Sequence, residues 1–286
     1  METISNIYKA QLSDKDFGTL ASIIIKETGI KMPIAKKVML QSRLKKRLTE
    51  LNFTNFGDYT NYVVSKQGFS TELIHMIDAV STNKTDFYRE PVHFEVLNDL
   101  VLPRFARENH NQTFKAWSAG CSSGEEPYNI AMVVDDFIKK GYSFDCYVRA
   151  SDISTSILRM GINAVYTEQR ILPVPKNMLH KYFMRSKDKT KRIYKVIPEL
   201  RKKVQFSRIN FMDETFKVPE RFDVIFCRNV LIYFDRPTQE AVVSKLLRHL
   251  KPGGYFFIGH SESLIDMDLP IKGVRPTVFR KIGGME

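Results

Sequence analysis

The feature that most constrains the fold is a glycine- and serine-rich loop between a strand pattern and a helix pattern. Residues 114–119 have the short apolar pattern of a buried parallel strand, and residues 128–134 continue as an apolar helix. The loop between them, residues 120–126, reads Gly-Cys-Ser-Ser-Gly-Glu-Glu and follows the carboxyl end of the first strand. Ligands bind at this position in open α/β sheets, because small residues let the backbone approach them.

The composition of this loop indicates which ligand it suits. It lacks the Gly-x-Gly-x-x-Gly dinucleotide fingerprint, and no Gly-Lys-Ser/Thr follows it. Glu125 and Glu126 at the helix start would repel a pyrophosphate. S-adenosylmethionine, which has an ammonium, a sulfonium and a ribose, is the leading candidate. The alternative is a tight strand-to-helix turn in which the two acids only favour the helix N-terminus.

Later segments add strands to the same sheet. Residues 145–153 predict a second strand that ends in Asp152, whose carboxylate suits two ribose hydroxyls, although a helix cap before residues 155–160 is the alternative. Residues 222–230 predict another buried strand. Residues 250–259 predict a helix end, a Pro-Gly-Gly turn and a further strand. This order resembles the Rossmann-like methyltransferase fold, an α/β class.

Composition agrees with a two-domain enzyme. The chain has 286 residues, is 43% hydrophobic and carries a formal charge of +12. It has neither an apolar run of membrane-spanning length nor a signal-peptide pattern, so we expect a soluble, cytoplasmic protein without membrane insertion. Cys121, Cys146 and Cys227 lack metal-ligand spacing, and we expect buried thiols and no metal site. We also expect a monomer.

The first 75 or so residues predict a small all-helical domain. Leu40, Leu44, Leu48 and Leu51 recur at helical spacing after Pro33. From residue 31 to residue 48 the chain has seven Lys or Arg residues and no acid. Such a run is usually a solvated face, but the missing acids favour a docking surface for an acidic partner. On one flank of the predicted helix lie Lys36, Arg43, Lys46 and Arg47.

A second basic block predicts an insertion. Residues 185–208 contain ten Lys or Arg residues and two acids, between the second and third core strands. Residues 193–197 alternate like an exposed strand, which predicts a small antiparallel β subdomain at about residues 164–203.

Four unusual sequence motifs occur together, and they resemble the motifs of the CheR family of chemoreceptor glutamate methyltransferases. The motifs are Ser-Thr-Asn-Lys-Thr-Asp-Phe-Tyr-Arg-Glu at 81–90, Ser-Ser-Gly-Glu-Glu-Pro-Tyr at 122–128, Ala-Ser-Asp-Ile at 150–153, and Phe-Cys-Arg-Asn-Val-Leu-Ile-Tyr-Phe at 226–234. The resemblance spans roughly residues 12–282. It implies a receptor-docking helical domain at 1–75, a linker at 76–90 that contributes to the cofactor site, and a catalytic domain at 91–286.

The resemblance also implies a reaction. The methyl group of S-adenosylmethionine would pass to glutamate side chains in the cytoplasmic helices of bacterial chemoreceptors, giving methyl esters and S-adenosylhomocysteine in chemotactic adaptation. Family members that bind a receptor's carboxyl-terminal peptide carry a glycine-rich loop in the insertion. This chain has no glycine at 186–192, so direct recognition of the receptor helices is the expected mode.

Site residues follow from the same resemblance. Arg89 is expected near the cofactor and the acceptor carboxylate; its alternative is an ion pair with Glu90 or Asp86. Tyr233 is expected to orient the substrate through its hydroxyl; its alternative is a core aromatic residue. Glu126 is expected at the cofactor's ammonium and Asp152 at its ribose. The remaining expected cofactor contacts are Asn83, Thr85, Asn210, Phe211, Asn229 and Val230.

Residues 228–233 read Arg-Asn-Val-Leu-Ile-Tyr, whereas methyltransferases that act on exocyclic amines carry an Asn/Asp-Pro-Pro-aromatic motif at this position. A glutamate acceptor gives a chemical reason for this difference. A carboxylate is already an anionic nucleophile at neutral pH, so the enzyme needs positioning groups and no general base. Two other classes compete with this interpretation. A nucleic-acid methyltransferase would interleave aromatic residues with its basic clusters, and we expect no nucleic-acid partner here. A non-catalytic cofactor-binding module should have lost Arg89 or Tyr233.

Overall fold

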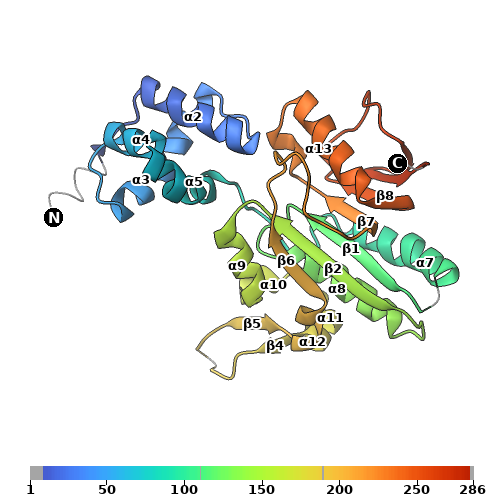
Figure 1. Ribbon diagram of the computed structural model, residues 1–286. Helices are drawn as coiled ribbons and strands as arrows, with labels where there is room; N and C mark the ends of the chain where they lie inside the picture. The colour runs from blue at the N-terminus through green and yellow to red at the C-terminus, as the bar shows by residue number, and fades with distance from the viewer. Residues whose placement is uncertain (1–8, 110, 189, 284–286) are drawn as a thin grey trace.

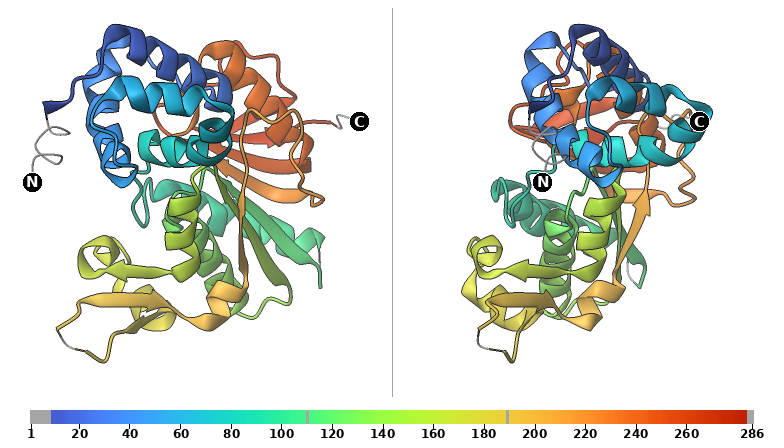
Figure 2. Two further views of the ribbon diagram at one scale, coloured as in Figure 1. Left: turned by 60° about the vertical axis from the view of Figure 1, so that its left-hand side comes forward. Right: turned by 90° about the vertical axis from the view of Figure 1, so that its left-hand side faces the viewer.

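The computed structural model describes residues 9–109, 111–188 and 190–283, which form a helical lobe and an α/β lobe joined by residues 81–91 (Figure 1). A small third unit extends from the α/β lobe, and Figure 2 shows it at the opposite end of the molecule from the helical lobe. Within the described residues, no helix is long and apolar enough to cross a membrane.

The helical lobe buries one face of each of its main helices. Its elements are α2 (Asp14–Thr28), η1 (Ile34–Lys36), α3 (Lys37–Glu50), α4 (Phe56–Val64) and α5 (Lys66–Val80). Leu40, Leu44 and Leu48 of α3 are fully buried, as their spacing predicts. They share a core with apolar side chains of α2, α4 and α5.

The α/β lobe is built on a seven-stranded sheet with the order β6-β2-β1-β7-β8-β10-β9. Its strands are β1 (Thr113–Ala119), β2 (Asp145–Asp152), β6 (Val204–Arg208), β7 (Phe222–Cys227), β8 (Leu250–Ile258), β9 (Ile271–Arg275) and β10 (Val278–Lys281). The pairs from β6 to β8 are parallel, whereas β10 is antiparallel to both of its neighbours. This order confirms the predicted Rossmann-like methyltransferase fold.

Helices cover both faces of this sheet because successive strand residues point to opposite sides. On one face, Val224 and Phe226 of β7 share a core with α6 (Val92–Val96), η2 (Leu97–Val101), α7 (Leu102–Glu108) and α8 (Glu125–Ile138). On the other face, Ile225 and Trp117 share a core with α13 (Arg236–Arg248). Two further helices of the α/β lobe are α9 (Thr155–Asn163) and the short helix η3 (Leu231–Tyr233).

The predicted insertion is present as a three-stranded antiparallel sheet with the order β3-β5-β4. Its elements are β3 (Val165–Thr167), α10 (Glu168–Ile171), α11 (Lys176–Tyr182), β4 (Phe183–Arg185), β5 (Ile193–Val196) and α12 (Pro198–Lys202). They lie between α9 and β6 in the chain, and we call this unit the inserted subdomain. One residue of the loop between β4 and β5, Lys189, lies outside the described residues.

The Pro252-Gly253-Gly254 segment corrects one sequence-based expectation. It is not a turn before the strand, because β8 already begins at Leu250, directly after α13 and His249. Phe222 pairs with Leu250 and Val224 with Tyr255, so two steps along β7 face five steps along β8. The segment is therefore an irregularity within the strand, with Gly253 at a φ of 74°.

Candidate active site

A deep pocket opens where the helical lobe meets the carboxyl ends of β1, β2 and β7. It encloses about 1270 Å³ of empty space, including its open mouth. The helical lobe contributes Thr28, Ile30, Met32, Lys36, Met39 and Val80 to its lining, and residues 81–86 and Arg89 form another wall. The pocket therefore belongs to both lobes and to the segment that joins them.

The glycine loop forms the floor of the pocket in a conformation that requires its small residues. Gly120 has a φ of 87°, and a Cβ on it would lie 2.4 Å from Cγ2 of Val230. Gly124 has a φ of 95°, and its Cβ would meet Cα of Gly161 and the hydroxyl of Tyr166, each at 3.0 Å. The amides of Gly120 and Cys121 both donate to the Ser151 carbonyl at 2.8 Å. The loop is therefore fixed against β2.

Asp152 lies at the end of β2 and faces the pocket. Its carboxylate accepts from the backbone amides of Ser122 at 2.9 Å and Ser154 at 3.0 Å. Burial raises its pKa, although these amide bonds oppose the rise. The N-cap residue of α9 is Ser154, whose Oγ accepts from the amide of Ile157, and Asp78 of α5 accepts from the amides of Thr155 and Ser156. Asp152 thus steadies the loop before the helix and keeps lone pairs available for a ligand's hydroxyls.

Glu126 belongs to a buried chain of charges. Its carboxylate accepts from the Ser118 hydroxyl at 2.7 Å and lies 3.2 Å from the Arg228 guanidinium, which also pairs with Glu90 at 3.1 Å. The Arg228 side chain is only 2% exposed. One guanidinium shared by two carboxylates leaves the cluster negative on the pocket side, which suits a ligand's ammonium group. Burial raises the pKa of Glu126, against the attraction of Arg228.

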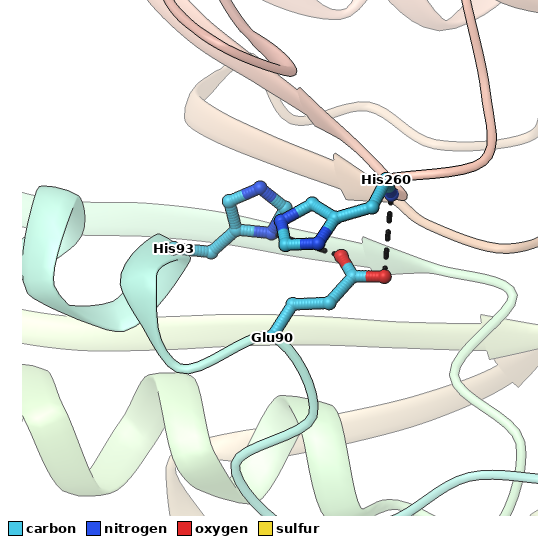
Figure 3. Close-up of side chains that lie close together, drawn as sticks. All are labelled: Glu90, His93 and His260. Atoms are coloured by element: carbon cyan, nitrogen blue, oxygen red, sulfur yellow. Dashed lines mark hydrogen bonds and ion pairs between the residues drawn. The ribbon is translucent and has the colours of Figure 1, made fainter.

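Glu90 also meets two histidines, His93 and His260, from separate elements (Figure 3). It accepts from the backbone amide of His260 at 3.2 Å, and His93 Nδ1 lies 3.4 Å from its carboxylate. Such a trio resembles a cation site, but Arg228 already supplies the positive charge beside Glu90. Burial and Arg228 lower the pKa of His93 to about 4, so its imidazole is neutral at pH 7. We assign the trio a structural role in holding Glu90 and Arg228.

The predicted adenine-side residues all line the pocket, but two of their side chains have partners within the protein. The Asn210 amide donates to the Glu27 carbonyl at 2.6 Å, and its oxygen accepts from the Met212 amide at 3.0 Å. Asn210 therefore fastens the helical lobe to the end of β6. Asn229 donates to Glu90 at 3.3 Å. Phe211 and Val230 give the pocket its apolar side.

Glu262 is a residue of this site that the sequence analysis missed. Its buried carboxylate accepts from the amides of Asn229 at 2.9 Å, Val230 at 2.8 Å, Leu231 at 2.7 Å and Gly259 at 2.5 Å. Four backbone donors on one carboxylate fix the loop after β7. The available signal was the polar run Gly-His-Ser-Glu that directly follows the strand pattern ending at residue 258.

The remaining predicted residues enclose the pocket from the joining segment and from η3. The backbone carbonyl of Asn83 accepts a hydrogen bond from the Ser122 hydroxyl at 2.8 Å, and Thr85 lines the same wall of the pocket. Arg89 donates to the Lys84 carbonyl at 3.0 Å. Among the described residues no carboxylate pairs with Arg89, so the ion-pair alternative is not observed. Tyr233 lines the pocket, and its carbonyl accepts from the Lys31 amide at 2.9 Å.

The four cations expected on one flank of α3 are divided by the structure. Arg47 pairs with the buried Glu72 at 2.6 Å, and Arg43 donates to the carbonyls of Val80 and Ser81. These two arginines are held within the lobe, which corrects the expectation of a four-residue surface. Lys46 is 82% exposed, and Lys36 lies at the pocket.

The strand order, the glycine loop and the pocket carboxylates Glu126 and Asp152 define an S-adenosylmethionine-dependent methyltransferase. Residues 83–278 match the family model described as CheR methyltransferase, SAM binding domain, and residues 15–81 match the CheR methyltransferase, all-alpha domain. The chain therefore belongs to the CheR methyltransferase family.

Curated relatives cover almost the whole chain. A chemotaxis protein methyltransferase of Borreliella burgdorferi is 37% identical over 280 residues, which are 96% of this chain and 95% of that protein. The Salmonella typhimurium protein of the same name is 36% identical over 256 residues, which are 90% of this chain and 86% of that protein.

The pocket fits the cofactor of this family. A carboxylate at the end of β2 suits ribose hydroxyls, and the negative cluster at Glu126 suits an ammonium. The missing Cβ of Gly120 lets the Val230 side chain pack directly against the glycine loop, which brings the apolar side of the pocket next to that loop. S-adenosylmethionine supplies an electrophilic methyl group when bound, and the residues of this chain bind and orient it.

Proposed function

We propose that this methyltransferase transfers the methyl group of S-adenosylmethionine to glutamate side chains in the cytoplasmic helices of bacterial chemoreceptors. The products would be glutamyl methyl esters and S-adenosylhomocysteine, and the process would be chemotactic adaptation. The observation that carries the proposal is a pocket guanidinium, Arg89, that has no carboxylate within ion-pair distance among the described residues, although it attracts the Glu126 carboxylate from farther away. It can therefore pair with an acceptor carboxylate.

The side chains of the pocket agree with a carboxylate acceptor. Neither histidine nor cysteine is among the described residues that line it. An amine acceptor must lose a proton during methylation, whereas a carboxylate with a pKa near 4 attacks as the anion already present at pH 7. Arg89 would hold one oxygen of the acceptor while the other attacks the methyl carbon, and the hydroxyl of Tyr233 would donate to the acceptor.

Docking would use the exposed flank of α3 beside the pocket. Val38 is 76% exposed and Lys46 is 82% exposed, and they lie about two helical turns apart, roughly 12 Å along the axis of α3. An exposed apolar side chain and an exposed lysine along one helix suit an acidic, amphipathic receptor helix.

The experiment supplies the protein with labelled S-adenosylmethionine, chemoreceptor membranes and total RNA. Label on the receptor that mild alkali releases as methanol would support the proposal, because methyl esters hydrolyse and methylated bases do not. Label on RNA, or on neither substrate while the cofactor still binds, would contradict it.

Arg89→Ala tests the residue that carries the proposal. We expect ester formation to fall at least 100-fold with the fold intact, because the acceptor loses its cation. Arg107→Ala, an exposed arginine on α7, is the matched control and should keep full activity. Full activity in Arg89→Ala would refute the role.

A further inference from the structure

The inserted subdomain contacts two walls of the cofactor pocket without lining the pocket itself. No described residue between 164 and 203 belongs to the pocket lining. Two side chains at the start of the subdomain, Tyr166 and Arg170, nevertheless reach the glycine loop. An influence of the subdomain on the cofactor must therefore act through that loop or through the joining segment, which Tyr166 and Phe183 contact at Phe87.

Arg170 closes a small ring of polar contacts behind the glycine loop. Its Nη2 lies 2.6 Å from Oε1 of Glu125 and donates to the Ser123 hydroxyl at 2.8 Å. The Ser123 hydroxyl in turn donates to Oε2 of Glu125 at 2.7 Å. Glu125 is fully buried, and Arg170 is 30% exposed at its side chain. The ring thus joins α10 to the first turn of α8.

Tyr166 braces the same loop and the neighbouring wall. Its hydroxyl donates to the Ser123 carbonyl at 2.8 Å. Its ring contacts Phe87 edge-on at 4.9 Å between centroids, and Phe87 contacts Phe183 of β4 at 5.5 Å. Phe87 lies two residues before Arg89, on the segment that forms the other wall. Tyr166 therefore supports both walls of the pocket from behind, through Ser123 and through Phe87.

The positive charge of Arg170 matters because the Glu125 carboxylate beside it is buried. A buried carboxylate without a cation is strongly unfavourable, so the first turn of α8 depends on Arg170 to keep Glu125 in place. Glu126 follows immediately, and Ser122, whose amide holds Asp152, lies three residues earlier. A shift of this turn would move both carboxylates that face the cofactor.

We propose that Arg170 is a positioning residue for the cofactor, and that the inserted subdomain sets the affinity for S-adenosylmethionine by clamping Ser123 and Glu125. The subdomain's role is then not confined to the protein's outer surface. This assignment rests on cofactor binding and is independent of the acceptor's identity.

Calorimetric titration of the full chain with S-adenosylhomocysteine tests the proposal. We expect Arg170→Met to weaken binding about tenfold or more, and Arg170→Lys to restore most of the loss because it keeps a cation beside Glu125. Arg192→Met is the matched control. Arg192 belongs to the same subdomain but pairs with Glu168 at 3.3 Å on the surface, and its side chain is 76% exposed.

A merely structural role would give a different result. It would lower the melting temperature of Arg170→Met and leave its dissociation constant, measured on folded protein, equal to that of Arg192→Met. That outcome would overturn the proposal.

Two further variants keep the test decisive if Arg170→Met does not fold. Tyr166→Phe removes only the hydroxyl bond to Ser123 and should weaken binding about threefold, consistent with one hydrogen bond. In a Glu125→Gln background the buried charge is absent, so adding Arg170→Met should cost less affinity than it does in the wild type. Unchanged affinity in Tyr166→Phe would contradict the clamp.

Discussion

At the scale of single residues, the site depends on charges that the fold brings together from distant segments. Arg228 follows β7, Glu126 lies in the first turn of α8 and Glu90 precedes α6, yet one buried guanidinium pairs with both carboxylates. Their shared cation prevents two buried acids from repelling each other fully. The remaining negative charge lies where we expect the cofactor's ammonium.

The charge of Glu126 gives a pH-dependent prediction. Burial raises its pKa above the ordinary glutamate value of about 4.3, and only the ionised form attracts an ammonium. Affinity for S-adenosylhomocysteine should therefore fall as the pH is lowered from about 7, before an ordinary glutamate would titrate. Glu126→Gln should bind more weakly at pH 7 and show a flatter profile, as measured by calorimetry.

The exposed Glu214→Gln is the control for this experiment and should keep the wild-type profile. If Glu126→Gln shows the same pH dependence as the wild type, Glu126 does not face the ammonium.

The positions of site residues at the pocket were predictable where a local motif carried them, whereas their roles stay predictions. All ten residues expected at the cofactor and the acceptor line the pocket. The partners of Arg43 and Arg47 were not predicted, because helical spacing shows which flank a side chain occupies and not which partner lies there. Glu72 and the carbonyl of Val80 come from α5, which the fold packs against α3. Glu262 was missed for the same reason, because its partners are backbone amides after another strand.

At the scale of elements, local patterns correctly predicted β1, β2, β7, the glycine loop and the insertion, whereas β9 and β10 were not predicted. Each predicted feature has its own period or composition, and the parallel order follows from the alternation of strands and helices. The prediction of a turn before the strand at Pro252-Gly253-Gly254 was wrong, because β8 begins to pair with β7 at Leu250, and the segment became an irregularity inside the strand through this non-local pairing.

Asp78 provides a prediction about one element, helix α9. From α5, its carboxylate accepts from the amides of Thr155 at 2.9 Å and Ser156 at 3.1 Å, and so caps a helix of the other lobe. Asp78→Ala should lower the free energy of unfolding by about 1–2 kcal/mol, the usual cost of a lost cap. Urea denaturation measures this change.

Asp58→Ala is the matched control, because the exposed carboxylate of Asp58 accepts a hydrogen bond from Asn55 of the same helix start and contacts no other lobe among the described residues. We expect a change below about 0.5 kcal/mol for it. Equal stability of the Asp78 and Asp58 variants would show that the cap contributes nothing.

At the scale of the whole molecule, the helical lobe is a wall of the pocket as well as the expected docking surface. Contacts of Glu27 with Asn210 and of Lys31 with Tyr233 join it to the α/β lobe. An acceptor that docks on α3 would thus arrive beside the cofactor. This arrangement explains why a small helical domain is joined to a methyltransferase fold.

Lys46→Glu tests docking separately from cofactor binding. We expect receptor affinity to fall about tenfold, because an exposed cation facing an acidic helix is replaced by an anion. S-adenosylhomocysteine affinity should stay unchanged. Lys66→Glu makes the same charge change at the opposite end of α5 from the pocket residue Val80, and it should bind the receptor like the wild type. Equal receptor affinity of the two variants would contradict docking at α3.

The most direct test of the central claim is a calorimetric titration of the folded chain with S-adenosylhomocysteine, beside Asp152→Asn and Asp145→Asn. Asp145 begins the strand that Asp152 ends, and its side chain is 74% exposed. We predict one molecule bound per chain in the wild type and in Asp145→Asn, and at least tenfold weaker binding in Asp152→Asn, which loses charged hydrogen bonds to the ribose. Absence of binding to the folded wild type, or equal binding by both variants, would contradict the account.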